Sequence, residues 1–280
     1  MIDLHMHSTF SDGTDTPEEL IGHAVGLGLN AVALTDHDNT AGLPRFLKAG
    51  EGKPLRTVPG VELSVVHRPG AMHILGYFIR HDDPALNDQL TRIRTARSER
   101  NREIFDNLNK LGLSMTWDEI AAFAGEDVVG RPHFAQAMVT RGYVSDTQEA
   151  FDRYLARGKP AYARRRVMTP EEAVSAIKSA GGVPVLAHPI SLKLKFNELR
   201  DLIKQLRFQG LEGVEAYYSQ HSNGLRDQIL HIARDFDLVP TGGSDYHGAV
   251  KPDIRMGVGF GSLNVPDDIV DRLAARRNSA

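Results

Sequence analysis

The chain has 280 residues, of which 41% are hydrophobic and 25% charged, so it is long and apolar enough to bury a full core. Its net charge of −3 argues against a partnership with long nucleic acid, and the lack of cysteine excludes disulfides and thiolate metal sites. No apolar stretch reaches membrane-spanning length and no signal peptide is evident. We therefore expect a cytoplasmic protein with no membrane partner and no obligate protein partner.

A pair of histidines stands at the start of the chain. His5 and His7 lie two residues apart in an apolar segment, so on a strand both side chains would point to the same face. Asp12 follows five residues later. Two imidazoles and a nearby carboxylate are typical of a metal site, and a buried structural pair of histidines is the alternative.

Strand-like and helical segments alternate along most of the chain. Strands are expected over residues 2–7, 31–35, 57–62, 72–79, 183–187, 212–217 and 239–244, with helices over 16–28 and 40–49. Histidines and carboxylates recur at or near the strand ends: Asp36, His37, Glu62, His73, His188, Glu215, Asp245 and His247. Alternation with short loops predicts a parallel sheet, and polar groups at the strand ends are typical of a parallel β/α barrel.

The alternation stops between residues 83 and 162. Helices are expected there over 92–111, 117–124, 132–140 and 147–156. We therefore predict a barrel of residues 1–97 and 161–280, with a helical insertion of residues 98–160 that caps the active site; a crossover with only a packing role is the alternative. Arg131 and His133 stand at a helix start, where backbone N–H groups favour anions, and Lys159 lies in the loop that returns to the barrel.

Eight short motifs resemble those of the PHP (polymerase and histidinol phosphatase) family. They are His5-Met-His7, Ser11-Asp-Gly13, Leu34-Thr-Asp-His-Asp38, Pro59-Gly-Val-Glu62, His73-Ile-Leu-Gly76, Gly130-Arg-Pro-His133, Leu186-Ala-His-Pro189 and Gly243-Ser-Asp-Tyr-His247. The resemblance covers almost the whole chain and implies an α/β fold, a distorted (β/α)7 barrel. The insertion resembles that of stand-alone nucleotide phosphoesterases, which include a nucleoside 3′,5′-bisphosphate phosphatase and 5′→3′ exoribonucleases.

The resemblance also implies a trinuclear metal centre. Carried over by motif, the first ion would be held by His5, His7, Glu62 and Asp245, the second by Glu62, His73 and His188, and the third by Asp12, His37 and His247. Glu62 would bridge two ions. Imidazole and carboxylate ligands suit Mn, Fe, Zn or Mg. We expect two or three ions, with Mn2+ first.

The charge of such a centre favours a phosphate substrate. Three carboxylates contribute about −3 and three divalent ions about +6, so the site would attract a phosphate monoester dianion. A metal-bridging hydroxide would attack phosphorus. Asp36 and His221 are candidate proton donors to the leaving group, although Asp36 could equally orient an imidazole ligand. Candidate substrate contacts are Asp12, Gly13, Arg131, His133, Lys159, Ser219 and His221.

The predicted partner is a small nucleotide or short oligonucleotide. We expect a metal-dependent phosphatase that removes the 3′-phosphate of nucleoside 3′,5′-bisphosphates to leave the 5′-monophosphate. The alternatives are a 5′→3′ exonuclease on short oligoribonucleotides and a histidinol-phosphate phosphatase. An alternative of a different class is a non-catalytic, metal-stabilised accessory module, which would not bind three ions.

Overall fold

The computed structural model describes residues 1–123, 129–164 and 167–277. The chain divides into two compact units. One comprises Met1–Leu90 and Val167–Ala280 and is called the barrel unit below, and the other is Thr91–Arg166, the insertion unit. Among the described residues, no helix has the length and apolarity that crossing a membrane requires.

Seven strands form a nearly closed barrel, which confirms the predicted fold class. In chain order and in sheet order they are β1 (Ile2–Met6), β2 (Ala31–Leu34), β3 (Arg56–Val65), β4 (Met72–Tyr77), β5 (Val183–Leu186), β6 (Gly213–Tyr218) and β7 (Val239–Gly243). The segment after β7 returns to β1, where the Asp245 N–H donates to the His5 carbonyl and the His7 N–H donates to the Tyr246 carbonyl, each at 2.9 Å.

Strand β4 corrects the prediction of a wholly parallel sheet. It pairs antiparallel with both β3 and β5, whereas the other neighbouring strands pair parallel. Only residues 66–71 connect β3 to β4, and a parallel crossover needs a dozen residues or more. The reversal places His73 at the start of its strand, opposite Ser64 of β3, and therefore at the same barrel edge as the ends of the parallel strands.

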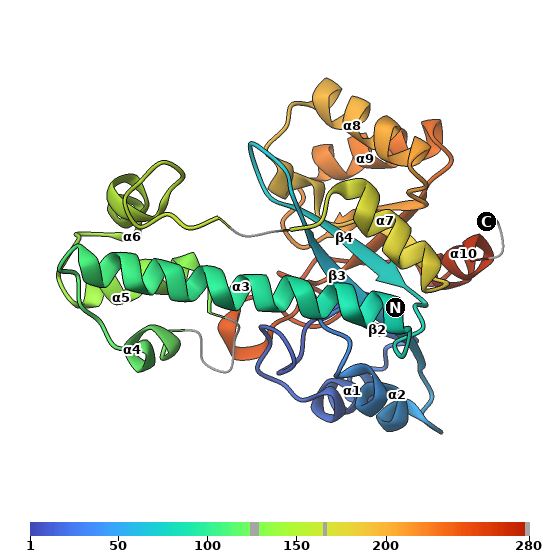
Figure 1. Cartoon of the computed structure of the whole chain (residues 1–280). Helices are drawn as coiled ribbons and strands as arrows, with labels where there is room; N and C mark the ends of the chain where they lie inside the picture. Colours follow the sequence, from blue (N-terminus) through green and yellow to red (C-terminus); the bar gives the residue numbers. More distant parts are fainter. Residues whose placement is uncertain (124–128, 165–166, 278–280) are drawn as a thin grey trace. The chain divides into compact units, whose positions relative to one another are not determined.

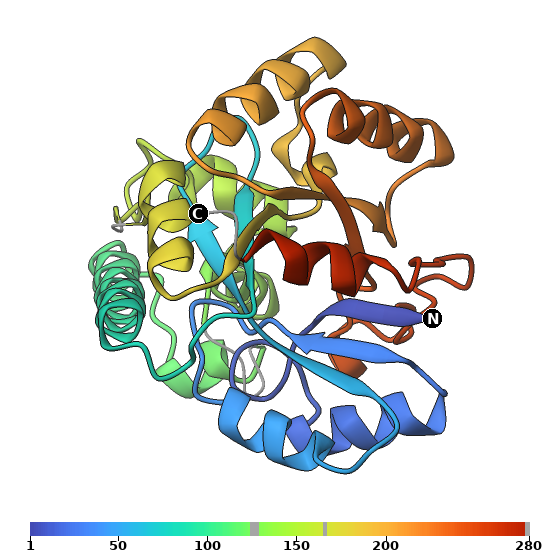
Figure 2. The same cartoon turned by 90° about the vertical axis from the view of Figure 1, so that its right-hand side faces the viewer.

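Helices cover the outside of the barrel and one of its two ends (Figure 2). They are α1 (Pro17–Gly26), α2 (Leu43–Gly50), α7 (Pro170–Ser179), α8 (Phe196–Phe208), α9 (Asn223–Asp235) and α10 (Ile269–Arg276), with the 3-10 turns η2 (Pro189–Leu192) and η3 (Gly248–Val250). The predicted helix start at Thr16 is confirmed by a capping box with Glu19. Thr169 and Glu172 make the same arrangement at the start of α7.

The apolar core fills the barrel end at which most strands begin. Ile269, Val270 and Leu273 of α10 pack against residues at strand starts, including Ile2 and Val239. Side chains therefore close this end, and the opposite edge carries the polar groups. This division is typical of β/α barrels, whose functional sites lie at the carboxyl ends of the strands.

The insertion unit is helical and has its own core. Its elements are the greater part of α3 (Pro84–Lys110), then α4 (Trp117–Ala121), α5 (Arg131–Thr140), α6 (Thr147–Ala150) and the π-helix η1 (Phe151–Leu155) (Figure 1). Ile104, Leu108, Phe134, Met138 and Leu155 are fully or almost fully buried within it. Residue 124, the expected end of the helix at Trp117, lies outside the described residues.

Candidate metal centre

All nine predicted ligands meet at the carboxyl edge of the barrel. His5 and Glu62 lie on β1 and β3, His7 directly follows β1, and His73 is the second residue of the reversed β4. The others lie in loops that follow strands: Asp12 after β1, His37 after β2, His188 after β5, and Asp245 and His247 after β7. Six of the seven strands, all except β6, thus contribute a ligand themselves or through the loop that follows them.

Glu62 lies at the centre of the cluster and is 1% exposed. Its Oε1 is 2.7 Å from His73 Nδ1 and 2.8 Å from His188 Nε2. Its Oε2 is 3.2 Å from a ring nitrogen of each of three further histidines, His5, His7 and His37. One carboxylate therefore contacts five imidazoles, which is a suitable geometry for a bridging ligand.

Asp12 and Asp245 both contact His7, which Glu62 also contacts. Asp12 Oδ1 is 3.2 Å from His7 Nδ1, and its Oδ2 is 3.4 Å from His37 Nε2 and 3.3 Å from His247 Nε2. Asp245 Oδ1 is 3.3 Å from His7 Nε2. Neighbouring carboxylates therefore share histidines, and His7 contacts all three.

Four groups of donor atoms are each compact enough to surround one ion, with all atoms of a group within 4.8 Å of one another. They are His7–Asp12–His37–His247, His5–His7–Asp245, His5–Glu62–His188 and His37–Glu62–His73. The groups include all nine predicted ligands, but they separate His73 from His188, which the resemblance assigns to one ion. Which residue holds which ion stays a prediction.

The orientation of the rings fits a metal. His5 Nδ1 contacts Glu215 at 3.0 Å, His188 Nδ1 contacts Ser191 Oγ at 2.9 Å, and His247 Nδ1 donates to the Asp245 carbonyl at 2.8 Å. Their Nε2 atoms are left for the cluster, as is usual for metal-bound histidines. Within the described part of the chain, the buried atoms His7 Nε2 and His37 Nδ1 find no well-oriented hydrogen-bond partner.

The carboxylates and imidazoles of the cluster shift one another's pKa. Burial alone would raise the pKa of Glu62, but the imidazoles of His37, His73 and His5 outweigh burial and hold that pKa well below its usual range. Burial would likewise lower the pKa of His5, but Glu215 and Glu62 outweigh it and raise that pKa well above the usual range. Such a buried set of carboxylates is suited to binding cations.

Three further residues support the ligands and were not among the predicted site residues. Glu215 Oε2 accepts the His188 N–H at 2.7 Å, so this one carboxylate positions two ligands. Tyr218 OH and Lys251 Nζ donate to Asp245 Oδ2 at 2.9 and 3.0 Å. The position of Glu215 in β6 was the only sequence signal, whereas Lys251 lies in a loop with no distinguishing pattern.

Asp36 holds the loop after β1. Its carboxylate accepts hydrogen bonds from Ser8 N at 2.8 Å and from the hydroxyls of Ser8 and Ser11 at 2.7 Å. Burial raises the pKa of Asp36 to about 6. Ser11 Oγ lies 3.4 Å from His7 Nδ1, so the contacts favour an orienting role over proton donation. The catalytic role of Asp36 stays a prediction.

His221, the other candidate proton donor, follows β6. Its Nδ1 donates to the Ala216 carbonyl at 3.0 Å, so the ring is held with Nε2 unprotonated when neutral. Burial lowers the pKa of His221, which disfavours the protonated form that a proton donor requires. Its ring packs against Tyr218 at a centroid distance of 5.1 Å.

Asp12, Gly13 and Ser219, all predicted substrate contacts, belong to the barrel unit. Asp12 is partly exposed and lies within the cluster. Packing requires glycine at position 13, because a Cβ there would lie 2.2 Å from the His7 carbonyl oxygen. Ser219 Oγ donates to the Ser244 carbonyl at 2.7 Å. Contact of these residues with substrate stays a prediction.

Arg131, His133 and Lys159 all belong to the insertion unit. Arg131 begins α5, and its guanidinium lies 5.9 and 6.0 Å from the ring centroids of Phe151 and Tyr162. His133 Nδ1 accepts the Gly130 N–H at 3.1 Å and so caps the helix. Lys159 is exposed. Their contact with substrate also stays a prediction.

Comparison with known proteins adds independent findings. The PHP domain family model matches residues 3–227. The 5′-3′ exoribonuclease Rnm of Salmonella typhimurium is 35% identical over 247 residues, which cover 88% of this chain and 84% of that protein. The 3′,5′-nucleoside bisphosphate phosphatase of Chromobacterium violaceum is 35% identical over 248 residues, covering 88% of this chain and 87% of that protein.

A solved structure agrees with the fold over nearly the whole chain. It is described as a metal-dependent phosphoesterase and comes from Bifidobacterium adolescentis. Its TM-score is 0.78 at 31% sequence identity, and the match covers 98% of this chain and 96% of that one. The likeness therefore includes both the barrel and the insertion.

Proposed function

The chain belongs to the PHP domain family, and from this premise we propose that it hydrolyses a phosphate monoester of a small nucleotide with the help of divalent ions. The preferred substrate is a nucleoside 3′,5′-bisphosphate, which would lose its 3′-phosphate. The 35% identity to a protein named 3′,5′-nucleoside bisphosphate phosphatase supports the choice of substrate. Mn2+ is the ion we favour, because the donors are imidazoles and carboxylates without any thiolate.

The observation that carries the proposal is the position of Glu62 among five histidines. Asp12 and Asp245 complete a set of three carboxylates, and the six imidazoles bind metals in their neutral form. Two or three divalent ions would more than neutralise these carboxylates. The site would then carry the net positive charge that a phosphate dianion requires.

Each residue of the cluster has a proposed role. His5, His7, Glu62 and Asp245 would hold one ion, His73 and His188 would complete a second with Glu62, and Asp12, His37 and His247 would hold a third. The ions, when bound, would supply an activated water nucleophile and positive charge for the phosphoryl oxygens. Glu215, Tyr218 and Lys251 keep these ligands in position through the hydrogen bonds described above.

The test is release of inorganic phosphate in the presence of Mn2+. The panel comprises adenosine 3′,5′-bisphosphate, 5′-AMP, a diribonucleotide and histidinol phosphate. We expect the bisphosphate to give the highest kcat/KM and 5′-AMP to accumulate as product. Preference for histidinol phosphate would contradict the proposal, as would absence of turnover with every substrate. Absence of turnover together with metal analysis showing only one bound ion would instead favour the metal-stabilised accessory module.

A second candidate is a 5′→3′ exoribonuclease. The 35% identity to an enzyme of that name supports it as strongly as the phosphatase is supported. Cleavage of the diribonucleotide into mononucleotides, faster than phosphate release from the bisphosphate, would establish this alternative. Both reactions are hydrolyses of phosphoric esters, so the same cluster would serve either one.

A further inference from the structure

The insertion unit contains a pocket along one face of α3. Its volume is about 740 Å³, which lies within the range of small-molecule sites. Arg94, Ser98, Arg102 and Phe105 recur every three or four residues and therefore share one side of the helix. All the lining residues that the structure describes belong to the insertion unit, so the pocket shares no residue with the metal cluster.

An aromatic pair forms the end of this pocket. Trp117 of α4 packs edge-to-face with Phe105, at a centroid distance of 6.0 Å, and with the buried Phe134 at 6.2 Å. Although these contacts fix the indole, 42% of Trp117 remains exposed. A held but accessible indole is a suitable platform for a planar ring, and such stacking accepts any nucleobase.

Asn101 adds a buried acceptor to the pocket lining. It is 3% exposed, and its Nδ2 donates to the Val129 carbonyl at 2.6 Å, which fixes the orientation of the amide. Its Oδ1 is buried and meets no donor anywhere in the described ranges. Buried acceptors are rarely left unsatisfied, because the lost hydration is not replaced. A ligand with an amino group would satisfy this oxygen.

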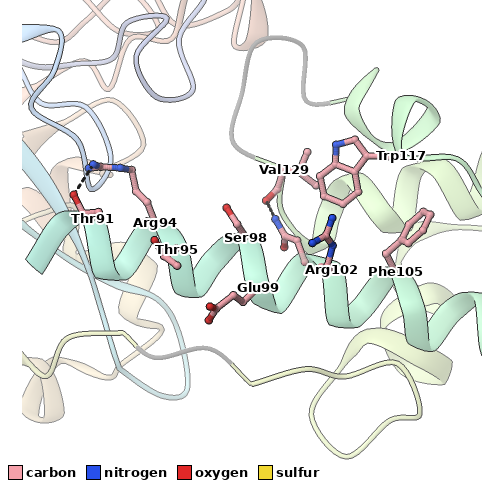
Figure 3. A pocket seen from close by; sticks show the side chains of 10 residues that line it. Thr91, Arg94, Thr95, Ser98, Glu99, Arg102, Phe105, Trp117 and Val129 are labelled. Atoms are coloured by element: carbon pink, nitrogen blue, oxygen red, sulfur yellow. Dashed lines mark hydrogen bonds between the residues drawn. The ribbon is translucent and has the colours of Figure 1, made fainter. Parts of the chain in front are cut away.

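Positive charge lies beside the aromatic pair. Figure 3 shows Arg102 between Trp117 and α3, with Arg94 further along the same side of the helix. Glu99 also lines the pocket, but its side chain points from the opposite side of the helix. As far as the structure describes the chain, the Arg102 guanidinium makes no ion pair or hydrogen bond. It is therefore available for an anion.

We propose that this pocket binds a nucleotide with an amino-bearing base, such as an adenosine monophosphate unit. The base stacks on Trp117, its amino group donates to Asn101 Oδ1, and its phosphate pairs with Arg102. The site is a second nucleotide site on the chain, and binding at it involves no metal ion and no bond cleavage.

The test uses Trp117 as its own reporter, because it is the only tryptophan of the chain. 5′-AMP is titrated into the full-length protein in EDTA, and the indole fluorescence is followed. We expect a saturable change in emission. Arg102→Gln should weaken the apparent affinity about tenfold or more, since it removes a charge-assisted contact. Lys110→Gln, which removes an exposed charge near the end of the same helix, should bind as the original protein does.

Ribose 5-phosphate and adenosine separate the two halves of the ligand, and each should bind more weakly than 5′-AMP. The proposal is overturned if 5′-AMP leaves the fluorescence unchanged, or if Arg102→Gln and the original protein respond alike. Circular dichroism of Arg102→Gln shows whether the variant is folded. Because the titration requires no turnover, a lack of phosphatase activity would contradict the proposed function without affecting this result.

Discussion

Glu215 is the residue whose function the structure defines most clearly beyond the predicted ligands. It is fully buried, and its two oxygens contact the His5 ring and the His188 backbone, which lie 183 residues apart in the chain (188 − 5). His188 has a φ of 22° and a ψ of 71°, an unfavourable conformation for a residue with a side chain. The hydrogen bond from its N–H to Glu215 helps to hold it there.

Replacing Glu215 with glutamine should weaken metal binding more than it harms catalysis. The amide keeps the size of the side chain but loses the negative charge that orients and polarises the His5 ring. Loss of such a partner typically lowers metal affinity by roughly 10–100-fold. We expect the Mn2+ concentration for half-maximal phosphate release to rise by that factor, while kcat at saturating Mn2+ is largely retained.

The matched control is Glu171→Gln, an exposed carboxylate in the first turn of α7, which should leave the Mn2+ dependence unchanged. If the Mn2+ dependence of Glu215→Gln is unaltered, Glu215 does not position the metal ligands. A loss of kcat that saturating Mn2+ does not restore would instead place Glu215 closer to the reaction.

Strand β4 shows what sequence patterns could and could not predict at the level of elements. Strand positions were predictable because apolar runs are local signals, whereas the set of nine polar residues was predicted from the motifs that resemble those of the PHP family. The direction of β4 was also accessible from the short connection at residues 66–71, which the alternation rule overlooked. Lys251 was not accessible, because its contact with Asp245 depends on how the loop after β7 folds.

The approach of β7 to β1 predicts a steric test. A Cβ added at Gly243 would lie 2.4 Å from both the backbone nitrogen and the Cβ of His5, closer than real Cβ contacts allow. Gly243→Ala should therefore destabilise the fold by about 1–3 kcal/mol, a typical cost of overpacking. At roughly 2–4 °C per kcal/mol, thermal unfolding should occur several degrees lower.

Gly224→Ala is the control for this test, since a Cβ there meets nothing within 4 Å and the residue lies in the first turn of α9. It should be neutral or slightly stabilising. If Gly243→Ala unfolds at the same temperature as Gly224→Ala, the closure of the barrel is looser than the structure indicates.

At the scale of the whole molecule, metal binding should stabilise the folded chain. Six imidazoles and three carboxylates from all around the barrel come together only on folding, so ions at the cluster would bind the native state alone. An ion present at about 100 times its Kd contributes about 2.7 kcal/mol. Removing it with EDTA should then lower the Tm by about 5–10 °C.

Differential scanning calorimetry with and without Mn2+ measures this shift. Glu62→Ala serves as the control, because it removes the carboxylate that contacts five imidazoles and should abolish most of the dependence on Mn2+. If the Tm of the original protein is the same with and without Mn2+, metal binding at the cluster is contradicted. An equal shift in Glu62→Ala would place the ion elsewhere.

The two units suggest a division between chemistry and specificity. All the proposed metal ligands belong to the barrel unit, whereas Arg131, a candidate substrate contact, belongs to the insertion unit. If the substrate carries two phosphates and the ions hold one of them, we expect Arg131 to pair with the other. Loss of a charge-assisted contact costs about 1.5–3 kcal/mol, or roughly one to two decades in rate constant. Arg131→Ala should therefore lower kcat/KM for a nucleoside 3′,5′-bisphosphate by that factor and affect a simple aryl phosphate far less.

Arg141→Ala is the control for Arg131→Ala, because it removes an exposed arginine just after the other end of the same helix. Its ion pair with Glu119 is at the surface and should contribute little. Unfolding temperatures of both variants separate substrate binding from the packing of Arg131 against Phe151 and Tyr162. Equal losses on both substrates would place Arg131 at the reacting phosphate. If kcat/KM falls for neither substrate, Arg131 has only a structural role at the start of α5. The specificity for two phosphates would then have to come from the barrel unit.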